Sequence, residues 1–142
     1  TAPTNTLITL GTESRVNTAD TAIIYAFTGI PGFSKFGSYT GNGNADGPMV
    51  NIGFSLKWLL VKETGNTNSW WMWSPEMDNS NPTINGLMAD SNDAQYTGTA
   101  HGLDILSNGF KWRGTDDDVN RSGGNYIYAA FAEFPQKTAR AH

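Results

Sequence analysis

The sequence has no cysteine and little charge. Without cysteine there is neither a disulfide framework nor a thiolate to act as nucleophile or metal ligand. Charged residues make up only 15% of the chain, and the nine Lys and Arg residues are scattered singly. A nucleic-acid-binding face needs clustered basic side chains, so we expect no nucleic-acid partner. No apolar run approaches the roughly 18 residues of a membrane helix, so we expect no membrane insertion.

Helical periodicity is also lacking. The chain holds 16 glycines, and its β-branched and aromatic residues gather in short runs separated by Gly, Asn, Asp and Ser. Such runs are typical of strands joined by turns, and here they recur at roughly 8–12-residue spacing. We therefore predict an all-β fold without a major helix. The expected architecture is an antiparallel β-sandwich of the jelly-roll or concanavalin-like kind, with about ten short strands.

The predicted strands follow from alternation of apolar and polar residues and from turn signals between them. Residues 56–64 give the strongest strand, and 69–73 return as its hairpin partner. Asn108-Gly109 is the best short hairpin signal, since this pair suits a two-residue turn. The full set of predicted strands is 6–10, 22–28, 33–40, 49–52, 56–64, 69–73, 84–88, 103–106, 110–113 and 125–134.

The end of the chain repeats its beginning. Residues 10–17 (LGTESRVN) match 113–120 (RGTDDDVN) at a constant offset, 119 − 16 = 103. Residues 23–27 then match 126–131 with one extra alanine, and each copy reaches a proline, Pro31 or Pro135. Self-similarity at a fixed period predicts a unit that recurs in a longer polypeptide. We predict one sandwich module over residues 1–135, with 1–31 echoing 104–135, and a C-terminal tail at 136–142.

A search for catalytic residues finds almost none. His101 lies three residues from Asp104, but no serine elbow accompanies them. Gly41-Asn42-Gly43 begins like a phosphate-binding loop, yet Pro48 and a strand-like run replace the helix that would hold the phosphate. We therefore predict that the chain is not an enzyme and takes no cofactor.

Two loops are rich in oxygen ligands. Asp116, Asp118 and Asn120 alternate as in a calcium loop, but Arg121 and Ile127 stand where such a loop needs glycine and a bidentate acid. The second loop contains Glu76, Asp78, Asn79 and Asn81. Solvated turns are the default interpretation of both, so no metal site is predicted.

The tryptophans are the best binding candidates. In one strand, Trp71 and Trp73 share a face while Trp70 points the other way. The shared face either belongs to the core or forms a platform on which sugar rings stack beside Asn and Asp. The candidate ligand-binding residues are Trp71, Trp73, Asp78, Asn79 and Asn81.

Five runs carry a family resemblance: residues 32–43 (GFSKFGSYTGNG), 46–48 (DGP), 53–54 (GF), 106–111 (LSNGFK) and 126–133 (YIYAAFAE). Together they resemble a domain of tailed-phage structural proteins, often found after laminin-G or concanavalin-like domains in tail fibres. The resemblance spans about residues 32–135. It implies a virion component, made in the bacterial cytoplasm and located on the extracellular phage particle. Other virion proteins would be its partners, and a homo-oligomer, with a trimer favoured, is expected.

Three functions follow as hypotheses. The first is a tail-fibre or receptor-binding module that adheres to a host-surface glycan, with avidity from multiple copies. The second is an architectural capsid- or tail-decorating domain that binds only virion proteins. An exposed apolar patch would favour the second, and an aromatic–polar groove the first. A glycan depolymerase is the minor alternative, because it requires two carboxylates facing each other across a cleft and the sequence shows no such pairing.

Overall fold

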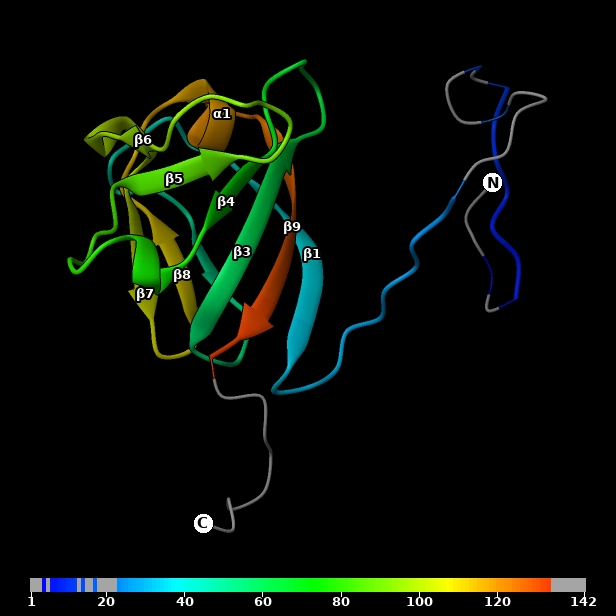
Figure 1. Ribbon diagram of the computed structural model, residues 1–142, viewed down its shortest axis with the longest axis horizontal. Helices are drawn as coiled ribbons and strands as arrows, with labels where there is room; N and C mark the ends of the chain where they lie inside the picture. Colours follow the sequence, from blue (N-terminus) through cyan, green and yellow to red (C-terminus); the bar gives the residue numbers. More distant parts are fainter. Residues whose placement is uncertain (1–3, 5, 13, 15–16, 18–22, 134–142) are drawn as a thin grey trace, which may run out of the picture.

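The computed structural model describes residues 4, 6–12, 14, 17 and 23–133. Two antiparallel sheets form an all-β sandwich, which confirms the predicted fold class (Figure 1). The larger sheet has the order β1 (Ser34–Thr40), β9 (Asn125–Ala132), β3 (Leu56–Glu63), β4 (Trp71–Trp73), β5 (Asn85–Met88) and β6 (Tyr96–Thr97). The smaller sheet has the order β2 (Met49–Asn51), β8 (Gly109–Trp112) and β7 (Leu103–Leu106).

Helical structure is confined to three short pieces in the described residues. These are η1 (Pro75–Met77), η2 (Thr99–His101) and α1 (Asp117–Asn120). The acidic turn predicted around Asp116 is therefore the start of a one-turn helix, since the Asp116 side chain accepts a hydrogen bond from the Asp118 amide. Among the described residues, no helix has the length and apolar character needed to span a membrane.

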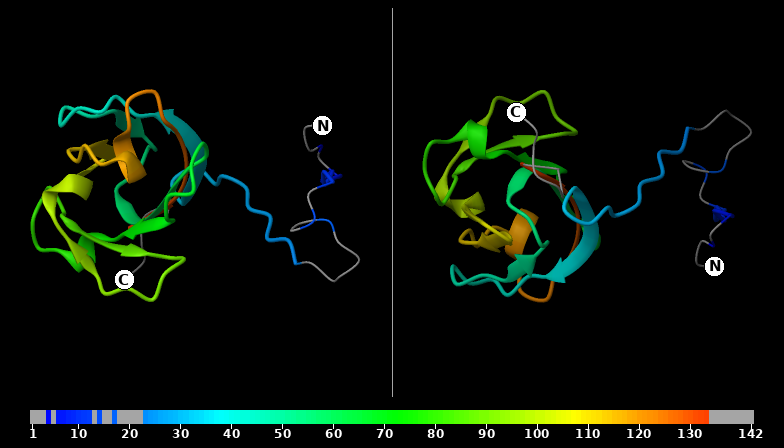
Figure 2. Two further views of the ribbon diagram at one scale, coloured as in Figure 1. Left: turned by 90° about the horizontal axis from the view of Figure 1, so that it is seen from above. Right: turned by 90° about the horizontal axis from the view of Figure 1, so that it is seen from below.

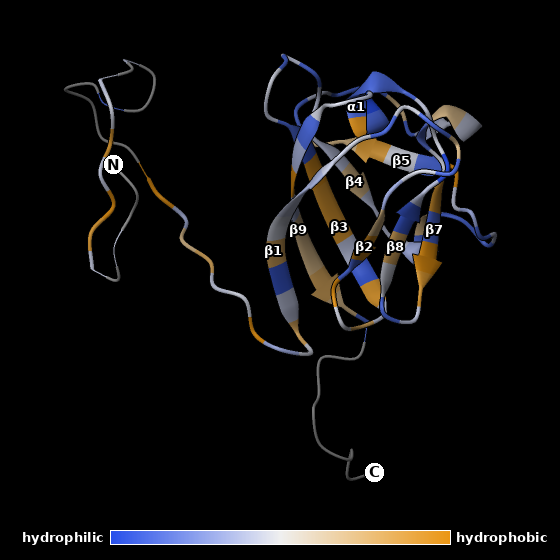
Figure 3. Ribbon diagram, turned by 180° about the vertical axis from the view of Figure 1, so that it is seen from behind, coloured by the Kyte–Doolittle hydropathy of each residue, from blue (hydrophilic) through white to orange (hydrophobic). Residues whose placement is uncertain are grey.

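The predicted strands at 6–10 and 22–28 are not found. The described residues in these ranges, 6–10 and 23–28, have no strand partner. Among the described residues before β1, only Ile30 makes an antiparallel bridge, to Ser34, at the tight turn that leads into the strand. Figure 1 shows residues 23–30 leading away from the sandwich. These residues keep an apolar sequence, as their colouring in Figure 3 shows, but the body of the domain does not cover them.

A β-bulge in β3 decides which side chains face the core. Leu56 pairs with Ala132 and Trp58 with Phe131, so an extra residue is inserted between them. Because the bulge shifts the alternation by one, Leu56, Leu59 and Val61 all point inward. Trp58 and Leu60 are left on the outer face of the sheet. Without this shift, a strand of period two would place Leu56 and Trp58 on the same side.

The core lies between the two sheets, which curve around a common interior when viewed along the strands (Figure 2). It is mostly aromatic. Trp73 meets Trp112 edge-on with ring centroids 5.0 Å apart, and Tyr39 stacks on Tyr126 at 4.9 Å. The Tyr126 hydroxyl donates to the Asp117 carbonyl at 2.6 Å and accepts from the Arg121 amide at 2.7 Å. The core thus anchors the α1 turn to β9.

One carboxylate is buried at the same end of the sandwich. The Glu63 side chain is 0% exposed. Its Oε2 accepts from the amides of Asn66 and Asn68, at 3.1 and 2.8 Å, and its Oε1 pairs with the Arg121 guanidinium. Buried charges persist when they are paired and hydrogen-bonded, which explains why an acid is tolerated here. The same ion pair raises the pKa of Arg121.

Candidate binding surface

Trp71 and Trp73 do not form a surface platform. Strand β4 turns both side chains inward, where they are 3% and 0% exposed, so the prediction that they contact a ligand at the surface is corrected. They pack on each other, and Trp73 also packs on Trp112. Trp70, which the alternation assigns to the opposite face, is 38% exposed. Of the two alternatives that the sequence left open, the structure supports the core.

Asp78, Asn79 and Asn81 do come together. With Pro75, Ser80 and Ile105 they line a shallow depression. Most of their polar atoms already have partners within the fold. Asp78 accepts from the Ile84 amide at 3.0 Å and from the Ser80 hydroxyl, and these bonds lower the pKa of its carboxyl. Asn81 accepts from the Ile105 amide at 2.8 Å and donates to the Ile105 carbonyl at 3.1 Å. These bonds hold the loop against β7.

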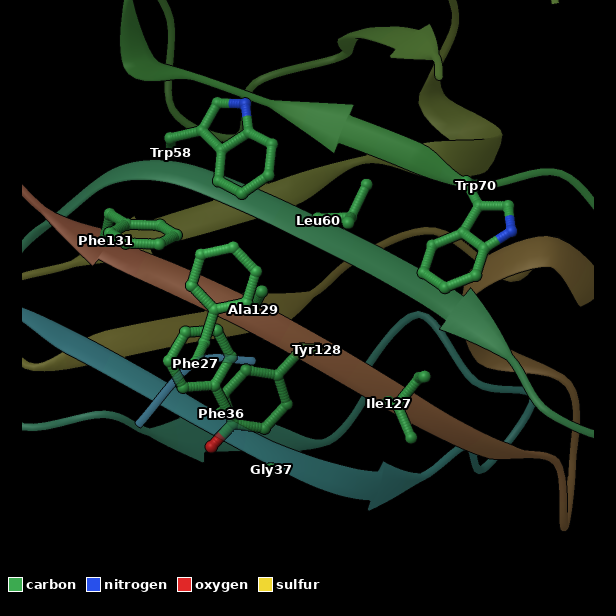
Figure 4. A pocket seen from close by; sticks show the side chains of 10 residues that line it. All are labelled: Phe27, Phe36, Gly37, Trp58, Leu60, Trp70, Ile127, Tyr128, Ala129 and Phe131. Carbon is green, nitrogen blue, oxygen red and sulfur yellow. The ribbon is translucent and has the colours of Figure 1, made fainter. Parts of the chain in front are cut away.

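A larger hollow than this depression lies on the outer face of the six-stranded sheet (Figure 4). Its volume is about 480 Å³. We call it the aromatic groove and define it by Phe36, Trp58, Leu60, Trp70, Ile127 and Phe131. Register places these residues in neighbouring rows: Phe36 pairs with Ala129, which pairs with Leu60, while Phe131 pairs with Trp58. Strands β1, β9 and β3 therefore supply most of the surface.

Aromatic packing shapes the groove. Phe131 meets Phe36 edge-on at 5.9 Å and lies 5.7 Å from Trp58, which makes a ridge at one end. Trp70 and Ile127, 38% and 42% exposed, flank the other end. Ala129 and Leu60 make the lower floor between them. The surface thus offers carbon-rich ridges and a hollow, with almost no polar group directed into it.

One further aromatic ring reaches the groove from outside the sheet. Phe27 stacks on Phe36 with centroids 5.7 Å apart, yet it is still 69% exposed. It belongs to the described segment that precedes β1. The groove therefore already accepts an aromatic side chain from an extended stretch of chain.

A second cluster lies at the α1 end of the sandwich. Potential ligand atoms of His101, Asp116 and Asp118 are all within 4.8 Å of one another. The His101 Nε2 is 3.5 Å from Asp116 Oδ1 and 3.7 Å from Asp118 Oδ2. Both carboxylates also have structural partners, since Asp116 caps α1 and Asp118 accepts from the Trp71 indole at 2.8 Å. The Asn120 side chain instead hydrogen-bonds to Asn42, Asn44 and Gly114.

Burial dominates the electrostatics of His101. The residue is 5% exposed, and its ring stacks on Trp71 at 4.2 Å and meets Tyr96 edge-on at 4.5 Å. Desolvation lowers the pKa of His101 below its usual 6.5, although Asp116 and Asp118 act in the opposite direction. In the native protein the imidazole is therefore neutral near pH 7.

This lowered pKa predicts a pH effect on stability. At pH values between the lowered pKa of His101 in the native protein and its usual 6.5, the unfolded chain binds more protons than the native one. Acidification through this range therefore favours unfolding. We expect the stability advantage of the wild type over His101→Gln to shrink as pH falls from about 7 to about 5. Urea unfolding of both proteins across this range measures it. An advantage that grows on acidification would mean that the two aspartates, rather than burial, control His101.

Sequence reasoning missed the aromatic groove, although part of its signal was present. The alternation of 56–64 separates Trp58 and Leu60 from Leu59 and Val61, and 125–134 alternates in the same way. What alternation cannot tell is which of two apolar faces is buried. On β9 both faces are apolar, with Tyr126 and Tyr128 inward and Ile127 and Phe131 outward.

Comparisons with known proteins place the chain in a family without assigning a function. No curated protein and no solved structure matches it. Residues 1–135 match a family described as a domain of unknown function, DUF7483. This match includes the described segment before β1 as well as the sandwich. Because it covers most of the sequence, the chain belongs to the DUF7483 family.

Proposed function

We propose that this chain is a non-catalytic, architectural module of a phage virion appendage. In this proposal the aromatic groove is an assembly surface that packs against a second copy of the chain. The virion context rests on the resemblance of residues 32–43, 106–111 and 126–133 to tailed-phage structural proteins. The assembly role rests on the groove, which is the single observation that carries the proposal.

The chemistry of the groove favours a protein partner over a glycan. Sites for small polar ligands combine apolar walls with a few convergent hydrogen-bonding groups. Here the six defining side chains are apolar or aromatic, and the indole nitrogens of Trp58 and Trp70 are their only polar side-chain atoms. A contiguous exposed apolar patch of this kind is typical of a protein–protein contact. Trp and Phe are also residues that concentrate at the centres of such interfaces.

The shape of the groove favours another copy of the same chain. Its face carries both protruding rings, at Trp58 and Trp70, and a lower floor at Ala129. A surface that presents ridge and hollow together can interdigitate with a rotated copy of itself, as closed symmetric oligomers require. The stacking of Phe27 on Phe36 shows that the hollow accommodates an added aromatic ring.

Adhesion to a host-surface glycan is the second candidate. The observation in its favour is that Asp78, Asn79 and Asn81 meet in one polar depression beside Ile105. Against it, the Asp78 and Asn81 side chains already hydrogen-bond within the fold. Without Trp71 and Trp73, which are buried, this depression lacks the aromatic stacking surface that the hypothesis assumed.

Self-association tests the proposal. The double variant Trp70→Ser, Ile127→Ser removes two exposed apolar side chains of the groove without touching the core. We expect it to raise the dissociation constant of the oligomer at least about tenfold, because interface centres with large apolar residues carry most of the binding energy. Sedimentation velocity over a concentration series measures this.

The matched control is Met49→Ser, since Met49 is 49% exposed and lies on β2, away from the groove. It should associate like the wild type. A wild-type protein that stays monomeric at its highest soluble concentration would contradict the proposal. Glycan-array binding that is lost in Asn79→Ala, with no effect of the groove variant, would instead support adhesion.

A further inference from the structure

Several apolar side chains before β1 have no place in this domain. Ile23, Ile24, Tyr25 and Phe27 are 77%, 54%, 79% and 69% exposed. None of the described residues 23–29 lies in a strand. Four large apolar side chains in five residues is a composition expected for a buried strand, not for a linker. Their exposure indicates that the surface that would bury them is supplied from outside residues 32–133.

The internal repeat indicates which surface that is. At an offset of 103, Ile23 and Tyr25 correspond to Tyr126 and Tyr128 of β9. Those two tyrosines point into the core and are 0% and 6% exposed. Between them, Ile24 corresponds to Ile127, which faces outward. The inward–outward order needed in β9 is therefore already present in residues 23–25.

A shared hydrogen bond supports the same correspondence independently of the sequence match. In the domain, the Asn120 side-chain amide donates to the Gly114 carbonyl at 2.9 Å, six residues earlier. In the N-terminal segment, the Asn17 amide donates to the Gly11 carbonyl at 2.6 Å, also six residues earlier. Asn17 and Asn120 differ by the same 103 positions. The segment thus contains the local bond of the turn that precedes β9, without the rest of the domain around it.

We infer that residues 23–30 complete a second unit of this fold, where they take the place that residues 126–133 occupy here. In that unit the donated strand lies between the counterparts of β1 and β3, which are the two neighbours of β9. Ile23 and Tyr25 then enter the core of that unit, and Ile24 joins its outer face. The unit that receives the strand precedes this one in the same polypeptide. Its chain runs from its own counterpart of β8 directly into the donated segment.

The chain between the two units is short. Ile30 bridges Ser34, and β1 of the present unit starts at Ser34. A strand that ends near Ile30 in one unit therefore leads into the next unit within a few residues. Consecutive units would be coupled closely rather than joined by a flexible linker. Phe27, which already contacts Phe36, lies at this junction.

A tandem protein tests the inference. Residues 32–113 are placed directly before residues 11–142, so that Gly11 follows Arg113 as Gly114 does in the natural chain. The front unit then has no β9 except the donated segment. We expect limited proteolysis followed by mass spectrometry to find both units protected. Separation of the protected species should recover one continuous fragment that includes both copies of β1.

Two variants of the tandem protein separate strand donation from a general apolar effect. Changing Ile23 and Tyr25 of the segment to aspartate places charges at the inward positions, and the front unit should be cleaved at least about tenfold faster. Changing Ile24 to aspartate puts one charge at the outward position and should leave protection nearly unchanged. In both variants the rear unit, with its own β9, reports that the protein is otherwise folded.

Cleavage throughout the front unit of the unmodified tandem protein, with the rear unit intact, would overturn the inference. So would equal effects of the inward and outward variants. The inference does not rest on the proposed assembly role of the groove. A protected tandem protein would retain the inference even if the natural chain stayed monomeric in sedimentation and so contradicted the proposed function.

Discussion

Replacing Trp73 by alanine is expected to lower the free energy of unfolding by about 3–5 kcal/mol, the usual cost of emptying a buried aromatic site. The side chain is 0% exposed, and its ring contacts Trp112 edge-on at 5.0 Å. Gly86 lies against the same indole, since a β-carbon there would be 3.0 Å from Trp73 Nε1. The cavity left by Trp73→Ala is therefore bounded by backbone and by a second tryptophan, which limits collapse.

Trp70→Ala is the matched control, because it removes the same side chain from the neighbouring position on the opposite face. Trp70 is 38% exposed, so at protein concentrations too low for self-association its loss should cost clearly less stability than the loss of Trp73. Urea unfolding followed by circular dichroism measures both variants. Since domains of this size are stable by roughly 5–15 kcal/mol, Trp73→Ala should remove a large share of the total. Equal losses for the two variants would contradict the inward orientation of β4.

Asn120→Ala is expected to destabilise the domain by about 3 kcal/mol. Asn120 is 0% exposed, and its side chain joins three segments. Its oxygen accepts from the Asn42 amide at 2.9 Å, and its nitrogen donates to the carbonyls of Asn44 and Gly114 at 2.8 and 2.9 Å. Removing one partner of a buried hydrogen bond costs about 1–3 kcal/mol. Three such bonds are lost here, but water that enters the site can hydrogen-bond to some of the groups left behind, so the total stays near the upper end of that range for one bond.

Asn17→Ala provides the control for this experiment. It deletes the same residue type and the corresponding bond to Gly11, but in the segment outside the sandwich. Its free energy of unfolding should match that of the wild type within about 0.5 kcal/mol. Thermal or urea unfolding compares the two. A small effect of Asn120→Ala would show that the turn at residues 41–47 is held mainly by backbone bonds, such as that from Gly47 to the Trp112 carbonyl.

The strands that were predicted well are those with local signals. Alternation over residues 56–64 and the Asn108-Gly109 turn identify β3 and the β7–β8 hairpin, and both are found. Strand β6 was missed because two residues, Tyr96 and Thr97, show no period. Helix α1 was missed because four residues are too few for helical propensity to matter, and tertiary contacts such as that of Tyr126 with Asp117 hold it.

The predicted strands before residue 30 failed for a different reason. Residues 23–28 have the composition of a strand, but a strand exists only when a neighbouring strand satisfies its backbone groups. Within residues 32–133 the place beside β1 and β3 is already filled by β9. The local pattern indicates that a segment is suited to a sheet. Which strand it pairs with depends on contacts between residues far apart in the chain.

Residue types and their period were sufficient to predict an antiparallel all-β sandwich, since these properties depend on neighbours in the chain. Which side chains form the exposed surface was decided by the tertiary structure. Trp58 lies outside and Leu56 inside because a single bulge shifts the alternation of β3. Trp71 and Trp73 are core residues because their strand faces Trp112 on the opposite sheet. Two apolar faces of one strand look alike in sequence, and only packing between sheets distinguishes the buried face from the exposed face.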